Sequence, residues 1–166
     1  MSPATPDPTP TAPRGPVLWL LRHGQAGDPP GVPDFDRPLT KRGEEQARSA
    51  GAALARLAPK IAVTFTSPRL RARRTAELAV GAHRGSPAPV EIDELGGDYG
   101  LQELLALLAP FTEGEDRANV LVVGHNPTLA WITHQLTRDD RGLGTGTLVG
   151  IDLVSRRLIQ HVRPAR

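Results

Sequence analysis

The stretch Val17-Leu18-Trp19-Leu20-Leu21-Arg22-His23-Gly24 decides the fold, because five consecutive apolar residues run without alternation into an arginine, a histidine and a glycine. Such a run predicts a strand buried on both faces, as in a parallel sheet covered by helices. Ligands of open α/β sheets bind beyond the carboxyl ends of the strands. Arg22 and His23 are therefore predicted to lie at a binding edge.

The chain has 166 residues, a length that favours one domain with a core of its own. Residues 1–16 contain six prolines separated mainly by Ser, Thr, Ala and Asp, a composition typical of a disordered tail. We predict a proline-rich tail over residues 1–16 and a single domain over residues 17–166.

Composition narrows the class of protein. The chain has no cysteine, which excludes disulfides, thiolate metal sites and cysteine-based phosphatase chemistry. It has no apolar run long enough for a membrane span and no secretory signal pattern, so we expect a cytoplasmic protein that does not bind membranes. The net charge is only +2 and no array of aromatic and basic residues accompanies it, so nucleic acid is not an expected partner.

Apolar spacing and turn residues predict strands that alternate with helices. Thr40 is the expected cap of the first helix, Ser67-Pro68 the start of the second, and Pro127 the start of the last. We expect a three-layer α/β sandwich with a mostly parallel central sheet and helices on both faces. The expected strands are 17–21, 61–66, 90–92 and 119–123, followed by an antiparallel pair over 147–153 and 157–162.

Arg71 is the unusual member of a group of arginines in the second helix. It falls inside the apolar stripe of that helix, whereas Arg73 and Arg74 fall on the solvent side and Arg69 on the margin. A buried charge needs a partner, and the amino-terminal end of a helix favours an anion. Arg71 therefore predicts either an anion site or an internal ion pair.

A second buried strand ends in Gly124-His125-Asn126-Pro127. Two histidines at the ends of two parallel strands can converge on one spot. His23, His125 and an aspartate could ligate zinc, but the adjacent Arg22 opposes a cation, so we expect no metal and no cofactor. His83, His134 and His161 are predicted to be ordinary surface residues.

These motifs together resemble the histidine phosphatase superfamily. Arg22-His23-Gly24 is similar to its first motif, and Thr66-Ser67-Pro68-Arg69-Leu70-Arg71-Ala72 to its second. Gly124-His125-Asn126-Pro127 and the loop 93–101, which ends in Gly-Asp-x-Gly-Leu, are similar to the SixA-type phosphohistidine phosphatases. The resemblance implies the phosphoglycerate mutase-like fold, with His23 as nucleophile and Arg22, Arg71 and His125 as the other catalytic residues.

Further site residues are expected around these four. Gly24 and Asn126 belong to the two histidine motifs, and Arg37 lies in the loop after the first strand, where it binds substrate or pairs with an aspartate. An alkyl phosphate needs a proton donor for its leaving group, and Glu94 and Asp98 are the candidate general acids. SixA-type members generally work without a dedicated acid.

The resemblance implies a phosphatase that hydrolyses phosphohistidine through a covalent phosphohistidine intermediate, with a phosphorylated protein as partner. The alternative within enzymes is a phosphomonoesterase for small phosphorylated metabolites, in which Glu94 or Asp98 matters. The alternative of another class is a non-catalytic module that binds phosphate. The sequence leaves the physiological substrate, the oligomeric state and the role of the tail open.

Overall fold

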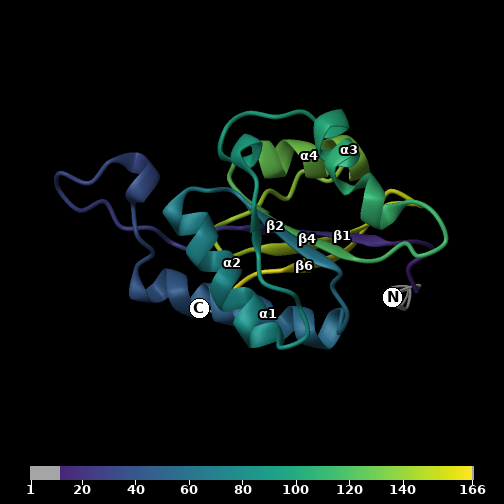
Figure 1. Ribbon diagram of the computed structural model, residues 1–166, viewed down its shortest axis with the longest axis horizontal. Helices are drawn as coiled ribbons and strands as arrows, with labels where there is room; N and C mark the ends of the chain where they lie inside the picture. Colours follow the sequence, from purple (N-terminus) through teal and green to yellow (C-terminus); the bar gives the residue numbers. More distant parts are fainter. Residues whose placement is uncertain (1–11, 166) are drawn as a thin grey trace, which may run out of the picture.

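A computed structural model describes residues 12–165 and shows a six-stranded sheet between two layers of helices (Figure 1). The strand order is β3-β2-β4-β1-β5-β6. The strands are β1 (Val17–Arg22), β2 (Val63–Thr66), β3 (Val90–Glu91), β4 (Val120–Gly124), β5 (Leu148–Asp152) and β6 (Arg157–Val162). β1 to β4 run parallel where they pair, and β5 and β6 add an antiparallel edge, as predicted.

Two helices cover each face of the sheet, so the predicted three-layer α/β sandwich is confirmed (Figure 1). The helices are α1 (Lys41–Leu57), α2 (Leu70–His83), α3 (Leu101–Thr112) and α4 (Thr128–Thr137). Alternate β1 residues face the two sides: Trp19 packs with α1 and α2, and Leu20 with α3 and α4. This double burial is why the β1 sequence lacks alternation.

The helix ends follow the sequence only in part. Thr40 caps α1, its hydroxyl accepting from the Gly43 amide at 3.1 Å, as predicted. α2 begins at Leu70, so Ser67 is not its cap, and α3 continues through Pro110 to Thr112. His83, predicted to be a surface residue, is 5% exposed and hydrogen-bonds the Ala58 carbonyl at 2.7 Å.

The packed part of the chain starts before residue 17. Pro16 is buried, and the Arg14 amide donates to the Asp152 carboxylate at 2.7 Å. The ordered contacts therefore begin inside the stretch that composition assigned to the tail, and residues 1–11 lie outside the described residues. No helix among the described residues is long and apolar enough to cross a membrane.

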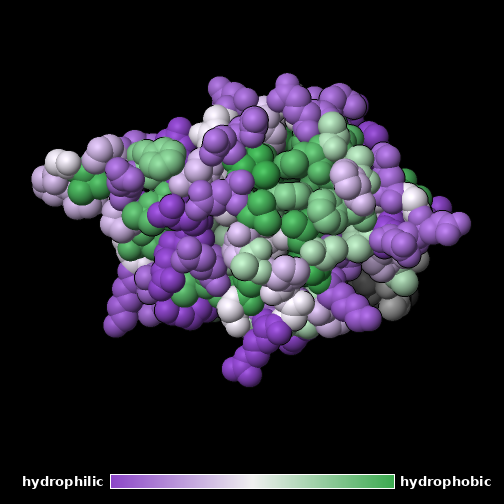
Figure 2. All heavy atoms as spheres, in the orientation of Figure 1, coloured by the Kyte–Doolittle hydropathy of each residue, from purple (hydrophilic) through white to green (hydrophobic). Residues whose placement is uncertain are grey.

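The loop between β1 and α1 reaches out from the body of the molecule, at the left of Figure 1. It contains the short helix η1 (Asp34–Asp36), and a bridge between Ala26 and Leu39 closes its base. Figure 2 shows apolar residues gathered at the centre of the same view, over β2 and beside α3, with hydrophilic side chains around them. The long loop therefore lies apart from this apolar surface and close to the carboxyl ends of the strands.

Candidate active site

The four residues expected to form the site meet at the carboxyl edge of the sheet. Arg22 ends β1 and is paired in register with Gly124 at the end of β4, which places His23 and His125 side by side. Their ring centroids are 5.1 Å apart, with the ring planes at 55°. The charge of Arg71, in the first turn of α2, acts on both histidines. The parallel pairing of β1 with β4 therefore brings together motifs about 100 residues apart in sequence.

His23 is held in one tautomer. Its Nδ1 lies 2.8 Å from the Gly24 carbonyl oxygen, which only accepts hydrogen bonds, so Nδ1 carries the proton and Nε2 the lone pair. Burial lowers the pKa of His23 to about 4, with the nearby charges of Arg71 and Arg22 acting in the same direction. His23 is therefore neutral at pH 7, with a nucleophilic nitrogen at Nε2.

His125 is also neutral in the free protein. Burial, together with the nearby charge of Arg71, lowers its pKa to about 3. His125 becomes protonated only when the negative charge of a bound phosphoryl group raises that pKa. Its Nε2 lies 2.6 Å from the Ser67 hydroxyl, which fixes the orientation of the ring.

Arg71 is buried at the site and meets Asp34 of the β1–α1 loop. The residue is 8% exposed, and one of its terminal nitrogens donates to the Asp34 backbone carbonyl at 2.8 Å. The other lies 3.4 Å from the Asp34 carboxylate, so the internal ion pair expected as one alternative is present. The Arg71 guanidinium remains part of a positive cluster with Arg22 that suits a phosphoryl dianion.

Arg22 is anchored from a different side. Its terminal nitrogen donates to the Leu143 carbonyl at 3.0 Å, and its Nε is buried with no hydrogen-bond partner among the described residues. The Asn126 amide donates to the same carbonyl at 2.7 Å. Leu143 thus connects the two histidine motifs through one oxygen atom.

Gly24 and Asn126 have structural contacts that the sequence did not show. A Cβ on Gly24 would lie 2.4 Å from the Gly43 carbonyl oxygen, so the strand end and the first turn of α1 approach as bare backbone. The side-chain oxygen Oδ1 of Asn126 accepts from the Ala130 backbone amide at 3.3 Å, and its side-chain nitrogen Nδ2 donates to the Leu143 carbonyl. Their assignment as substrate-binding residues stays a prediction.

Arg37 makes the contacts expected of a loop ion pair. Its terminal nitrogen lies 3.2 Å from the Asp34 carboxylate, and its Nε donates to the Gly27 carbonyl at 2.9 Å. The hydrogen bond from Arg37 is the main reason why the pKa of Asp34 lies below its usual range. Arg37 also helps to lower the pKa of His23, so its positive charge acts at the site.

Sequence reasoning missed three residues at this edge. The sequence predicts Ser67 as part of a helix start and Arg69 on the margin of the apolar stripe, and it assigns Asp34 no role at the site. In the structure Ser67 supports His125, Arg69 contacts the Asp34 carboxylate, and the Arg69 Nε donates to the Gly96 carbonyl at 2.8 Å. An Arg-Leu-Arg spacing at the start of a helix beside an acidic loop was the available signal for the contacts of Asp34.

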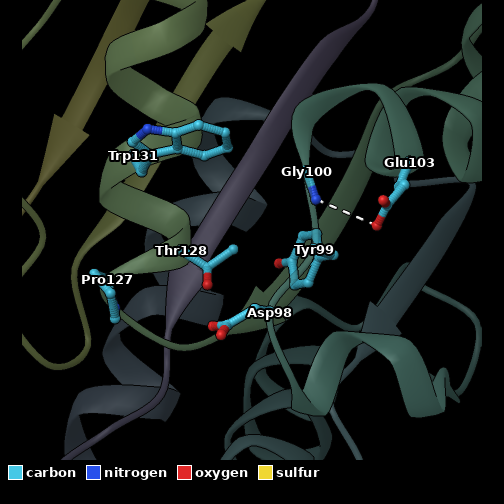
Figure 3. Close-up of a pocket in the computed structure, with 7 residues that line it drawn as sticks. All are labelled: Asp98, Tyr99, Gly100, Glu103, Pro127, Thr128 and Trp131. Atoms are coloured by element: carbon cyan, nitrogen blue, oxygen red, sulfur yellow. Dashed lines mark hydrogen bonds between the residues drawn. The ribbon is translucent and has the colours of Figure 1, made fainter.

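The candidate general acids are on the surface. Glu94 lies in the short helix η2 (Asp93–Gly96), and Asp98 follows it; both are exposed. Figure 3 shows the Asp98 carboxylate pointing toward Thr128 at the start of α4. Within residues 12–165, no group of three or more His, Asp or Glu side chains is arranged to hold a metal ion.

The fold and this arginine and histidine cluster define a phosphatase domain, and residues 18–104 match the histidine phosphatase superfamily (branch 1), to which the chain belongs. Among solved structures, it is similar to SixA from Agrobacterium tumefaciens, with a TM-score of 0.76 and 30% identity over 90% of this chain and 99% of that one. The structure of the protein histidine phosphatase SixA with tungstate shares the fold, with a TM-score of 0.73 and 24% identity over 89% of this chain and 97% of that one.

The chain is also similar in sequence to several curated proteins. A protein of Picosynechococcus sp. is 37% identical over 68% of this chain and 67% of its own length, and one of Mycobacterium tuberculosis is 34% identical over 65% and 64%. A 2,3-bisphosphoglycerate-dependent phosphoglycerate mutase of Caulobacter vibrioides is 42% identical over 47% of this chain and 34% of its own length. The matches thus span about two thirds of the first two relatives and about a third of the mutase.

Proposed function

We propose that this protein hydrolyses phosphohistidine on a phosphorylated protein, with His23 as the nucleophile. The observation that carries the proposal is the state of His23: its Nδ1 bonds the Gly24 carbonyl and its pKa is about 4, so Nε2 has a free lone pair at neutral pH. Arg22, Arg71 and His125 surround this ring with groups that stabilise negative charge on phosphoryl oxygens.

The first step transfers the phosphoryl group to His23. The Nε2 lone pair forms a bond to phosphorus while the bond from phosphorus to the substrate imidazole breaks. A substrate ring protonated on its other nitrogen leaves as neutral imidazole, so this step needs no added acid. The phosphorylated His23 ring carries the positive charge, and its Nδ1–H still donates to the Gly24 carbonyl.

In the second step, water attacks phosphorus and the bond to His23 Nε2 breaks. The water supplies the new oxygen of inorganic phosphate, its proton passes to the medium, and His23 returns to the neutral tautomer. The balance of both steps matches a site whose carboxylates Glu94 and Asp98 stay on the surface. An alkoxide leaving group, in contrast, would require a proton donor.

The names of the structural relatives agree with this proposal. Phosphohistidine phosphatase activity is attributed to SixA from Agrobacterium tumefaciens and from Nakamurella, each 30% identical to this chain. The mutase relative favours the second candidate, a phosphomonoesterase for small metabolites, for which Asp98 or Glu94 would be the acid. The predicted cytoplasmic location stays a prediction.

Phosphate release from two substrates tests the proposal. Release from a phosphohistidine-bearing protein and from a simple alkyl phosphate is compared for wild type, His23→Ala and the control His134→Ala, a half-buried histidine on α4 outside the histidine motifs. We expect fast release from the phosphohistidine protein only, lost in His23→Ala and kept in His134→Ala. Equal or faster release from the ester would favour the phosphomonoesterase, and phosphate binding without release from either substrate would favour a binding module.

A further inference from the structure

A groove of about 500 Å³ lies beside the site, between the start of α4 and the segment that leads into α3 (Figure 3). Trp131, Thr128 and Pro127 form one side of it, and Asp98, Tyr99, Gly100 and Glu103 form the other. The groove adjoins the site directly, because Pro127 follows the His125-Asn126 motif. A Cβ on Gly124, the residue before His125, would lie 3.6 Å from the Tyr99 hydroxyl.

The chemistry of the groove is opposite to that of the phosphoryl site. Its seven lining residues include two exposed carboxylates, Asp98 and Glu103, and none is basic. Trp131 is 49% exposed, although a large aromatic side chain of a monomeric surface is normally better covered. The positive cluster of Arg22 and Arg71 thus has an acidic and aromatic neighbour on the side of His125.

From this complementarity we propose that the groove binds a lysine or arginine side chain of the phosphorylated substrate protein, a few residues from its phosphohistidine. This inference rests on the proposed function and adds the character of the substrate sequence. A long basic side chain matches the lining in two ways: its apolar stem packs along Pro127 and the Trp131 ring, and its charge meets the carboxylates. An acidic side chain would be repelled by the same groups.

The groove follows the first turn of α4, which begins at Thr128, three residues after His125. The Leu129 amide donates to the His125 carbonyl at 3.0 Å and the Trp131 amide to the Pro127 carbonyl at 3.0 Å, so this turn stays close to the histidine motif. From Thr128 to Trp131 the helix rises about 4.5 Å, and an extended peptide rises about 3.3 Å per residue. The basic residue is therefore expected within about three positions of the phosphohistidine.

The test uses short glycine peptides with one phosphohistidine and one variable residue three positions away on either side. The variable residue is glycine, arginine, glutamate or leucine. Wild type is expected to cleave the arginine peptide with a kcat/KM about tenfold above that of the glutamate peptide, mainly through KM. The preference should shrink at high salt, because exposed charges are screened over about 3 Å at 1 M.

Two variants assign the preference to the groove. Trp131→Ala removes the ring, and Glu103→Gln removes the charge but keeps an oxygen that can accept from the Gly100 amide, now 3.3 Å from the Glu103 carboxylate. Each is expected to reduce the arginine preference at least about threefold and to leave kcat/KM for the glycine peptide unchanged. Val154→Ala and Glu115→Gln, exposed positions outside the groove, are the matched controls and should keep the full preference.

The other possible results separate the groove proposal from the proposed function. Hydrolysis of all four peptides at equal rates overturns the groove proposal and leaves the proposed function in place. An equal gain with leucine shows an apolar docking site and also overturns it. A lack of hydrolysis of every peptide, under conditions where an alkyl phosphate is cleaved, overturns the proposed function together with the inference.

Discussion

Lowering the pH from 7 to 5 should destabilise the fold through His23 and His125. Both rings have a pKa near 6.5 in the unfolded chain and of about 4 and about 3 in the fold, chiefly because they are buried. Between the folded and unfolded values the unfolded chain binds more protons, so stability rises with pH over this window and falls as the pH drops below 6.5.

The size of the effect follows from linkage. At pH 5 a ring with these two pKa values favours the unfolded state by about 2 kcal/mol, and at pH 7 by only about 0.2 kcal/mol. The two rings together should therefore remove about 3.5 kcal/mol of the free energy of unfolding between pH 7 and pH 5.

Urea unfolding of wild type, His23→Asn and His125→Asn at both pH values measures this loss. Each variant should lose about 1.5 to 2 kcal/mol less than wild type between pH 7 and pH 5. Packing changes that do not depend on pH cancel in the comparison of one variant at two pH values. If both variants kept the full wild-type difference, the two rings would not be held neutral by burial, and the argument for His23 as a free nucleophile at pH 7 would fail.

Three further substitutions test the site. Arg71→Lys replaces a planar fork by a point charge and should lower kcat/KM about 100-fold, measured as phosphate release at limiting substrate; a loss below threefold would contradict a direct role. Ser67→Ala removes the hydroxyl that orients His125 and should lower kcat about tenfold with KM little changed, whereas an equal loss in KM would indicate a general disturbance. Gly24→Ala places a methyl group against the Gly43 carbonyl and should reduce stability by about 2 kcal/mol in urea unfolding; unchanged stability would show that the backbone yields there.

The sequence predicts the layers, the strand polarity and the four central side chains, because each depends on a local pattern. The unbroken apolar runs of β1 and β4 indicate burial on both faces, and parallel pairing then brings His23 next to His125. Arg71 stands out because a charge falls in an apolar stripe. Each of these inferences needs only the spacing of apolar residues along one strand or helix and the residues at its ends.

The contacts that the sequence did not predict are those of polar side chains that have more than one available partner. Ser67 before a proline favours a helix cap. In the fold, Ser67 follows β2 and His125 follows the neighbouring β4, so the Ser67 hydroxyl bonds to the His125 ring instead. Asp34 has Arg37 three residues away, yet the fold also brings Arg69 and Arg71 to it from α2. The buried position of His83 likewise depends on the Ala58 carbonyl, a contact that no local pattern encodes.

The Leu143 carbonyl restricts changes of length in the loop between α4 and β5. Because Arg22 and Asn126 both donate to that single oxygen, any shift of the peptide moves the supports of both histidine motifs at once. Arg138, Asp140 and Arg141 in the segment before Leu143 are exposed, whereas Gly142 has a φ of 74°, which favours glycine. The loop should therefore accept substitutions at its exposed positions while tolerating little change in length, so that insertions and deletions disable it more readily than substitutions at those positions.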